Sequence, residues 1–300
     1  MEENRKLKLD IFGSIEQLIS VFKDFETKRK NYKLFFRGKS FDFETFCQYY
    51  PDDDAFNIDW TASARYDKLL VKQYKEEEKL TVIFFIDVGD NMVLGSGEKI
   101  KCECAAEIAL SLAFLAIMRG HRIGFVLFND KVKLFHPPKG GKRAFFSFAD
   151  ILTDGNNYGG GSNLNQVLDI VGSFPHYHGG VAVLISDFIR FDESIKNKLS
   201  LLSLSFETFS IIIRDSIDKE LPNVAGEFVI EDIQDGRQIV FDPRLAKRRY
   251  KNSMRDQEYM VKKIFNSAGI DSVEVMPNEQ FILKVGQFMH ERIKLKDFKK

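Results

Sequence analysis

The chain has 300 residues, of which 44% are hydrophobic, so it has enough apolar material for a sizeable core. Its 44 basic and 44 acidic side chains cancel, which removes the long-range attraction on which non-specific binding to nucleic acid or anionic membranes depends. Three cysteines cannot form a complete disulfide set and no secretion signal opens the chain, so we expect a cytoplasmic protein that does not bind nucleic acid.

The first 80 residues carry the weakest pattern in the chain. One amphipathic stretch stands out, because Ile15, Leu18, Ile19 and Phe22 are spaced to line one side of a helix. We therefore treat residues 1–80 as an N-terminal region, distinct from a main domain that we expect over residues 81–300.

A strand, a helix and a second strand are predicted next. Residues 81–87 form a continuous run of β-branched and aromatic side chains, which is typical of a strand covered on both faces. A helix is predicted over residues 99–119 and a strand over residues 122–128. The apolar run in this helix, residues 105–118, is shorter than the ~18 residues needed to cross a bilayer, so we expect a buried helix and no membrane span.

The alternation of strands and helices continues. Helices are predicted over residues 164–171 and 195–204, and strands over residues 181–186 and 208–213. Such alternation favours an α/β, Rossmann-like fold with a mainly parallel sheet and helices on both faces.

Residues 215–243 depart from this alternation. Two short strand-like runs, residues 228–230 and 238–241, flank the turn dipeptide Asp235-Gly236, which predicts an antiparallel hairpin. We expect this hairpin to be inserted in the main domain and to pack with residues 1–80 as a small β-rich subdomain. The remaining predicted elements are a helix, a strand and a helix over residues 245–267, 272–275 and 279–293.

Polar side chains gather where the predicted strands end. In an open parallel sheet, ligands bind beyond the carboxyl ends of the strands. Asp87 and Asp187 each end a strand, Ser162 precedes a helix, and Asn91 follows Asp87 closely. Their oxygens are of the kind that Mg²⁺ prefers. We expect these four residues to form a partner-binding site, which either holds a divalent cation or uses its aspartates to cap loops without metal.

The segment before the first core strand carries a family signature. Residues 50–54, 58–65 and 70–72 resemble the signature of the domain-of-unknown-function 58 family, which contains a von Willebrand factor A-like domain. The resemblance covers most of the chain and implies a von Willebrand factor A-like fold. Within the signature we expect Asp59, Trp60 and Arg65 to be structural, with the tryptophan packed on the core and the ion pair fixing a loop.

The resemblance also implies a metal-ion-dependent adhesion site. That site has an Asp-x-Ser-x-Ser loop, a distant threonine and a further aspartate. Asp87, Ser162 and Asp187 match it by position, whereas Gly89 and Asn91 stand in place of the two loop serines. The implied cofactor is Mg²⁺ or another divalent cation, and the implied partner is a MoxR-type AAA+ ATPase.

These observations favour a non-enzymatic protein-interaction or scaffolding module, an adaptor that docks an acidic group of a partner at the strand ends. The alternative is a divalent-metal-dependent hydrolase or phosphotransferase that uses the same aspartates. Two other signals are weaker: His176 and His178 lack further zinc ligands nearby, and residues 139–142 lack the spacing of a phosphate-binding loop.

Overall fold

The computed structural model describes residues 6–26, 45–50, 58, 60–66, 68–73, 79–169, 179–221, 226, 228–231, 238–241 and 243–297. The chain divides into two units, which we describe separately: residues 39–79, and residues 1–38 with 80–300. The second part of the larger unit begins at residue 80, whereas we expected the main domain to begin at residue 81. The first 38 residues, however, belong to the larger unit rather than to the smaller one.

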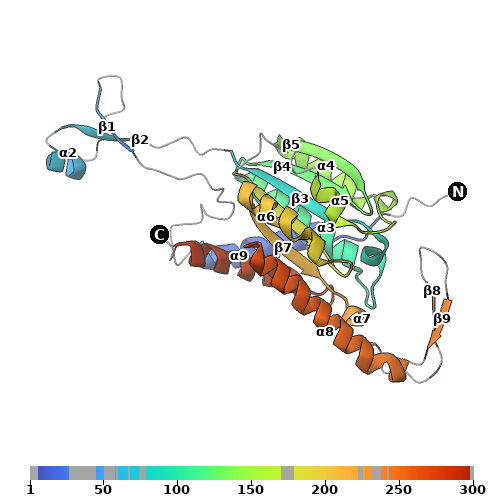
Figure 1. Ribbon diagram of the computed structural model, residues 1–300. Helices are drawn as coiled ribbons and strands as arrows, with labels where there is room; N and C mark the ends of the chain where they lie inside the picture. The colour runs from blue at the N-terminus through green and yellow to red at the C-terminus, as the bar shows by residue number, and fades with distance from the viewer. Residues whose placement is uncertain are drawn as a thin grey trace. The chain divides into compact units, whose positions relative to one another are not determined.

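A mainly parallel sheet forms the centre of the larger unit (Figure 1). Within the described residues it has six strands in the order β10-β7-β6-β3-β4-β5, and each neighbouring pair is parallel except β4 with β5. The α/β fold class expected from the sequence is therefore confirmed. The strands are β3 Thr81–Asp87, β4 Arg122–Phe128, β5 Val132–Gly140, β6 Val181–Ser186, β7 Glu207–Ile213 and β10 Asp271–Val275.

Successive residues of the central strand face opposite sides of the sheet and supply two separate cores. In β3, Val82, Phe84 and Ile86 belong to one hydrophobic cluster, while Ile83 and Phe85 belong to the other. All five side chains are buried. A strand that is covered on both faces has no solvent side, which is why its sequence shows no polar alternation.

Helices cover both faces of this sheet (Figure 1). Helices α1, α3, α4 and α9 contribute to the core on one face, and α5, α6 and α8 contribute to the core on the other. Their bounds are α1 Ile11–Glu26, α3 Lys101–Met118, α4 Lys142–Thr153, α5 Leu164–Val167, α6 Lys196–Ser205, α8 Pro243–Ser267 and α9 Phe281–Asp297. Shorter helical turns are η3 Asp90–Val93, η4 Gly155–Asn157, η7 Glu193–Ile195 and α7 Ser216–Lys219.

The segment before α1 is fastened to α3 by two buried glutamates. The backbone N–H of Lys8 donates to Glu103 Oε1 over 3.0 Å. Glu107 accepts from the backbone N–H of Asp10 at 2.7 Å and from the hydroxyl of Ser14 at 3.1 Å. Buried carboxylates need such donors, so these hydrogen bonds attach the segment to the larger unit, although Lys8 and Asp10 themselves are exposed. Among the described residues, no helix combines the length and the apolar character needed to cross a bilayer.

An edge strand and a helix that the sequence pattern did not predict lie beside β4. Strand β5 pairs with β4 in the antiparallel sense and contains Pro137 and Pro138. Proline lacks the N–H that a ladder needs, so it is tolerated in an edge strand, where one side of the backbone has no partner. Helix α4 follows immediately after Gly141, whose φ of +84° suits glycine.

The smaller unit contains two strands and a helix among its described residues. Strand β1 Thr45–Gln48 pairs with β2 Leu70–Gln73 in the antiparallel sense, and helix α2 Trp60–Tyr66 lies between them in the sequence. The hydroxyl of Ser63 accepts a hydrogen bond of 2.8 Å from the N–H of Leu70, which ties the helix to the second strand.

The structure places the family-signature residues in this smaller unit. We expected Trp60 to pack on the core, but its side chain is 70% exposed, and Arg65 is exposed as well. Among the residues of the smaller unit whose burial is described, Ser63 alone is buried, so they provide no core for the tryptophan. Asp59 lies outside the described residues, so its structural role stays a prediction.

The expected hairpin is present. Strand β8 Phe228–Glu231 pairs with β9 Gln238–Phe241 in the antiparallel sense, which confirms this element. The turn dipeptide Asp235-Gly236 lies outside the described residues. The packing of the hairpin against residues 1–80 stays a prediction.

The core on the α3 side depends on a cluster of aromatic rings around Phe148. Its ring stacks on Phe125 with centroids 4.3 Å apart and lies 5.6 Å from Phe84. We expect Phe148→Ala to lower the free energy of unfolding by about 3–5 kcal/mol, because it removes apolar contacts and leaves a cavity. Urea denaturation followed by circular dichroism measures this change.

Phe146, on the same helix but 62% exposed, supplies the control. We expect Phe146→Ala to change the free energy of unfolding by no more than about 0.5 kcal/mol. Equal effects of the two substitutions would contradict the packing described here.

Candidate functional site

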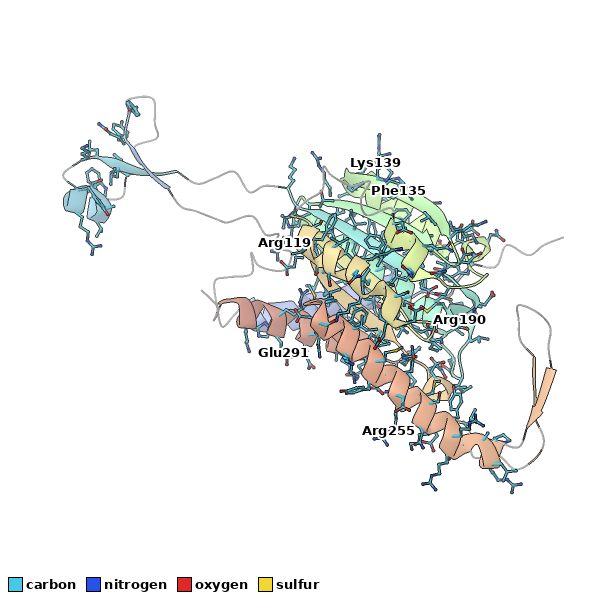
Figure 2. The ribbon with its side chains drawn as sticks, in the orientation of Figure 1. Arg119, Phe135, Lys139, Arg190, Arg255 and Glu291 are labelled. Carbon is cyan, nitrogen blue, oxygen red and sulfur yellow. The ribbon has the colours of Figure 1, made fainter. Side chains whose placement is uncertain are left out.

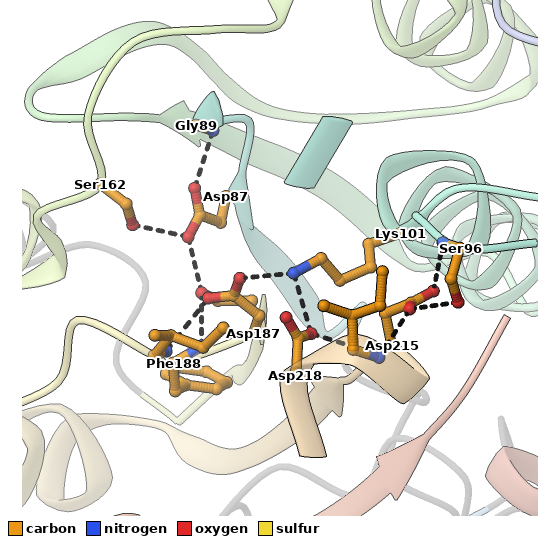
Figure 3. A network of polar contacts seen from close by, with 12 residues as sticks. Asp87, Gly89, Ser96, Lys101, Ser162, Asp187, Phe188, Asp215 and Asp218 are labelled. Atoms are coloured by element: carbon orange, nitrogen blue, oxygen red, sulfur yellow. Dashed lines mark hydrogen bonds and ion pairs between the residues drawn. The ribbon is translucent and has the colours of Figure 1, made fainter. Parts of the chain in front are cut away.

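The two strand-end carboxylates lie at the same edge of the sheet (Figure 3). Strands β3 and β6 are parallel neighbours in which Ile86 pairs with Ile185, so the residues that follow them emerge side by side. Asp87 ends β3 and is 1% exposed, and Asp187 follows β6 and is 2% exposed. The structure thus brings these two predicted site residues together below the surface.

Asp87 is surrounded by hydrogen-bond donors. Its Oδ1 accepts from the N–H of Gly89 at 2.9 Å. Its Oδ2 accepts from the hydroxyls of Ser162 and Ser186, both at 2.6 Å. Burial and the nearby charge of Asp187 raise the pKa of Asp87 from its ordinary value near 3.8 to about 6, although these hydrogen bonds act in the opposite direction.

Asp187 is paired with a lysine that the sequence analysis did not identify. Its Oδ2 lies 2.9 Å from Lys101 Nζ, and its Oδ1 accepts from the N–H of Ile189 at 3.1 Å. Phe188, which lies between Asp187 and Ile189 in the sequence, has a φ of +50°. It is the sole non-glycine residue with positive φ among the described residues. Such strain persists where surrounding contacts offset it, and the Phe188 ring packs on Phe265 with centroids 5.1 Å apart.

Lys101 is buried between two carboxylates. Its Nζ also lies 2.9 Å from Asp218 Oδ2, and its side chain is 1% exposed. Burial alone would lower the pKa of Lys101, but the negative charges of Asp187 and Asp218 outweigh it, so the pKa is raised. The side chain therefore carries a full positive charge beneath the strand ends.

The loop between β3 and α3 is fastened at a second point. Ser96 donates its hydroxyl to Asp215 Oδ1 at 2.5 Å and its backbone N–H to Asp215 Oδ2 at 3.0 Å. Asp215 also donates its own N–H to Asp218 Oδ2 at 2.8 Å. The loops after β3 and β7 are thereby joined through the same acidic turn that holds Lys101 (Figure 3).

Asp90, rather than Asn91, connects the loop after β3 to the glycine-rich loop. The N–H of Asp90 donates to the carbonyl of Gly160, and Asp90 Oδ1 accepts from the N–H of Gly160, both at 2.7 Å. Asn91 is half-buried in η3. In the described part of the chain, its side chain makes no hydrogen bond to Asp87 or Asp187, so the structure does not bring all four predicted residues into one cluster.

Gly89 stands where the adhesion-site loop has a serine because the space is filled. A Cβ atom at this position would lie 2.5 Å from the carbonyl oxygen of Gly161, closer than real Cβ contacts. A serine there requires the backbone of the glycine-rich loop to move. The local packing therefore explains why position 89 has no serine hydroxyl that could bind a metal.

The residues as arranged do not fit a divalent cation. Mg²⁺ takes an octahedral shell of oxygens, but Asp187 already binds the ammonium group of Lys101 and Gly89 contributes no oxygen from a side chain. Among the described residues, no group of three or more His, Cys, Asp or Glu side chains is arranged to hold a metal ion. A second positive charge beside Lys101 would be repelled.

The sequence analysis missed several residues of this network, among them Lys101, Ser186 and Asp218. A signal for the third was present, because Asp215 and Asp218 follow β7 just as Asp87 and Asp187 end or follow their strands. No sequence pattern indicated a role for Lys101, because a lysine in a first helical turn normally extends into solvent.

Comparison with known proteins gives a family and several structural likenesses. Residues 46–260 match the family described as "Protein of unknown function DUF58". The conserved hypothetical protein BatB from Bacteroides thetaiotaomicron is similar over 72% of this chain and 99% of its own, with 13% identity and a TM-score of 0.49. An aerotolerance-related membrane protein from Bacteroides fragilis, carrying multiple mutations to serine, is similar over 72% and 98%, with 14% identity and a TM-score of 0.49.

The VWA domain of SpRpn10 is a further solved structure with some likeness, over 69% of this chain and 93% of its own, with 11% identity and a TM-score of 0.43. No curated protein matches the chain. At this level of similarity the solved structures identify neither a partner nor an activity for it.

The raised pKa of Asp87 makes a testable contribution to stability. The carboxyl group of Asp87 holds its proton more tightly in the folded protein than in the unfolded chain. It therefore stabilises the fold at low pH and loses that contribution as the pH rises through about 6. At pH 8 the ionised carboxylate costs about 3 kcal/mol, at about 1.4 kcal/mol per pKa unit. We expect Asp87→Asn to gain stability relative to the wild type between pH 5 and pH 8 in urea denaturation.

Asp192→Asn serves as the control, because hydrogen bonds from Ser194 lower the pKa of Asp192 rather than raise it. We expect its stability relative to the wild type not to rise over the same pH range. A pH-independent difference for Asp87→Asn would show that Asp87 titrates normally.

Proposed function

The chain belongs to the family described as "Protein of unknown function DUF58", and we propose that it is a non-enzymatic protein-interaction or scaffolding module. Its docking surface is the strand-end face, which we define as the loops at residues 88–100, 129–131, 154–163 and 187–193. These loops all lie at the carboxyl end of the parallel strands, where folds of this class bind their ligands.

The observation that carries this proposal is the burial of the charged side chains beneath the strand-end face. A catalytic acid, base or nucleophile has to reach a substrate atom. The charged side chains at the strand ends are each 2% exposed or less, namely Asp87, Lys101 and Asp187. They contact neighbouring loops of the protein instead of facing a space that a substrate could enter. The thiols of Cys102 and Cys104 are buried too, and burial raises the pKa of Cys102 to about 12. The network is thus suited to holding loops in a fixed shape.

The strand-end face offers a partner a mixture of polar and apolar groups. Asn91 and Ser162 are half-buried, Leu94 is 48% exposed, and Arg190 is exposed in the loop after β6. Such a mixture of arginine, polar and apolar side chains is typical of protein interfaces. In this proposal an acidic group of the partner meets Arg190 and the polar rim above Asp87 and Asp187.

The resemblance of the signature to this family adds a specific partner to the proposal. A MoxR-type AAA+ ATPase, for which the protein acts as an adaptor in the cytoplasm, is the partner to test first. An adaptor needs a preformed surface rather than a reactive group, which is consistent with the buried network.

Reversing the charge of Arg190 tests the docking surface. We expect Arg190→Glu to weaken capture of the partner from lysate of the native cells by about tenfold or more, because an acidic group would then be repelled. Affinity capture with the tagged full chain, followed by mass spectrometry and a binding titration with the ATPase recovered, measures the loss.

Arg122→Glu is the matched control, because Arg122 is exposed at the start of β4, the opposite end of the sheet. Figure 2 labels Arg190 and, near the end of α3, Arg119 at these two ends. We expect Arg122→Glu to capture the partner like the wild type. Equal capture by all three proteins would show that docking uses another face.

One contact favours the second candidate, a hydrolase or phosphotransferase. The hydroxyl of Ser162 lies 2.6 Å from Asp87 Oδ2, and a carboxylate with a pKa of about 6 is within the range of a general base. Ser162 is half-buried rather than inaccessible. These two residues therefore offer a nucleophile and a base to any substrate that reaches them.

Assays with p-nitrophenyl phosphate and p-nitrophenyl acetate, in the presence of Mg²⁺ or Mn²⁺, separate the two functions. Under the docking proposal we expect no turnover above that of Ser162→Ala. A wild-type activity that falls by about 100-fold in Ser162→Ala, and not in the exposed control Ser194→Ala, would establish the enzymatic function instead.

A further inference from the structure

We infer that the ammonium group of Lys101 supplies the positive charge that a divalent cation supplies in an adhesion site, so that the strand-end face is assembled without metal. This inference rests on the proposed function for its consequence, which is that partner docking is independent of magnesium. A side chain of the protein thus takes the place of a metal cofactor.

The position of Lys101 is that of a bridging cation. Its Nζ lies 2.9 Å from Asp187 and 2.9 Å from Asp218, so one cation bridges carboxylates that follow two different strands. Lys101 itself begins α3, after the loop that leaves β3. The ammonium group therefore joins the ends of three neighbouring strands, β3, β6 and β7, as a bound cation would.

The acceptor on the β7 side is held in place independently of Lys101. Asp215 and Asp218 form the capping box of α7, in which Asp215 accepts from the N–H of Ile217 and Asp218 accepts from the N–H of Asp215. Ser96 holds Asp215 from the β3 loop. The carboxylate of Asp218 thus has a fixed orientation toward Lys101 and is not a surface side chain that happens to reach it.

Position 101 disfavours a lysine unless its ammonium group is paired. A helix N-terminus carries a partial positive charge, which acts against a cation in the first turn. Lys101 nevertheless lies there with a side chain 1% exposed. The carboxylates of Asp187 and Asp218 together compensate the burial and the helix end.

The oxygens that a metal would need as ligands are missing or already occupied. The loop position at 89 is a glycine whose missing Cβ leaves room for the carbonyl of Gly161. The Asp87 oxygens accept from Gly89, Ser162 and Ser186. A divalent cation at Asp87 would have to displace these donors, and one at Asp187 or Asp218 would be repelled by the charge of Lys101.

Calorimetric titration of the full chain with MgCl₂ and MnCl₂ tests this inference directly. We expect no saturable heat for the wild type. Saturable binding by the wild type that is lost in Asp187→Ala would overturn the inference, because it would show that a divalent cation reaches this carboxylate in spite of Lys101.

Lys101→Met tests the role of the ammonium group, with Lys99→Met as its control. Lys99 lies two residues earlier and pairs with Glu107 at 2.6 Å, so its loss leaves the strand-end carboxylates unchanged. In EDTA we expect Lys101→Met to lower the melting temperature by roughly 10 °C, and magnesium to restore part of the loss. We expect magnesium to leave the melting temperature of Lys99→Met unchanged.

A folded Lys101→Met protein whose melting temperature does not respond to magnesium would also overturn the assignment. If Lys101→Met does not fold, the wild-type titration decides alone, with no saturable heat supporting the inference. Partner capture in EDTA distinguishes this inference from the proposed function. If the partner is captured with magnesium but not in EDTA, metal independence is contradicted and the docking function is not. If the partner is captured neither in EDTA nor with magnesium, the docking function alone is contradicted.

Discussion

The strand ends of this protein are organised by the need to pair one buried positive charge. Moving an isolated ammonium group from water into a protein interior costs several kcal/mol even after relaxation. Lys101 is buried because Asp187 and Asp218 each place a carboxylate oxygen 2.9 Å away. Since these three residues stand at the ends of three adjacent crossover units, the pairing also fixes how the loops after β3, β6 and β7 lie relative to one another.

Much of the fold could be predicted from the sequence, because strands buried on both faces leave uninterrupted apolar runs. The runs that begin at Thr81, Arg122 and Val181 show this directly, and each is a strand of the sheet. β5 could not be found in this way, because Pro137 and Pro138 suggest a loop unless the strand is known to lie at an edge. Glu107 interrupts an apolar run for a reason that only tertiary structure shows, namely the N–H and hydroxyl groups of the segment around α1.

The candidate site, like the fold, could be predicted from the sequence only in part. Asp87 and Asp187 could be predicted, because parallel pairing brings residues that follow neighbouring strands to one edge. Lys101 could not, because the decision between solvent and interior depends on a carboxylate that lies 117 residues further along the chain. The reason for Gly89 is equally non-local, since it depends on the close approach of Gly161. A sequence pattern identifies ligands for a cation more readily than it identifies the cation.

The attachment of the N-terminal segment to α3 has a practical consequence for anyone who divides the protein. Sequence similarity to the family spans residues 46–260, which begins after α1 and stops inside α8. A recombinant fragment cut at those limits would lose the donors to Glu103 and Glu107 that come from Lys8, Asp10 and Ser14, and it would leave β7 without its neighbour β10. An uncovered strand edge invites self-association. For this chain, the region matched by the family is smaller than the unit that shares the hydrophobic core.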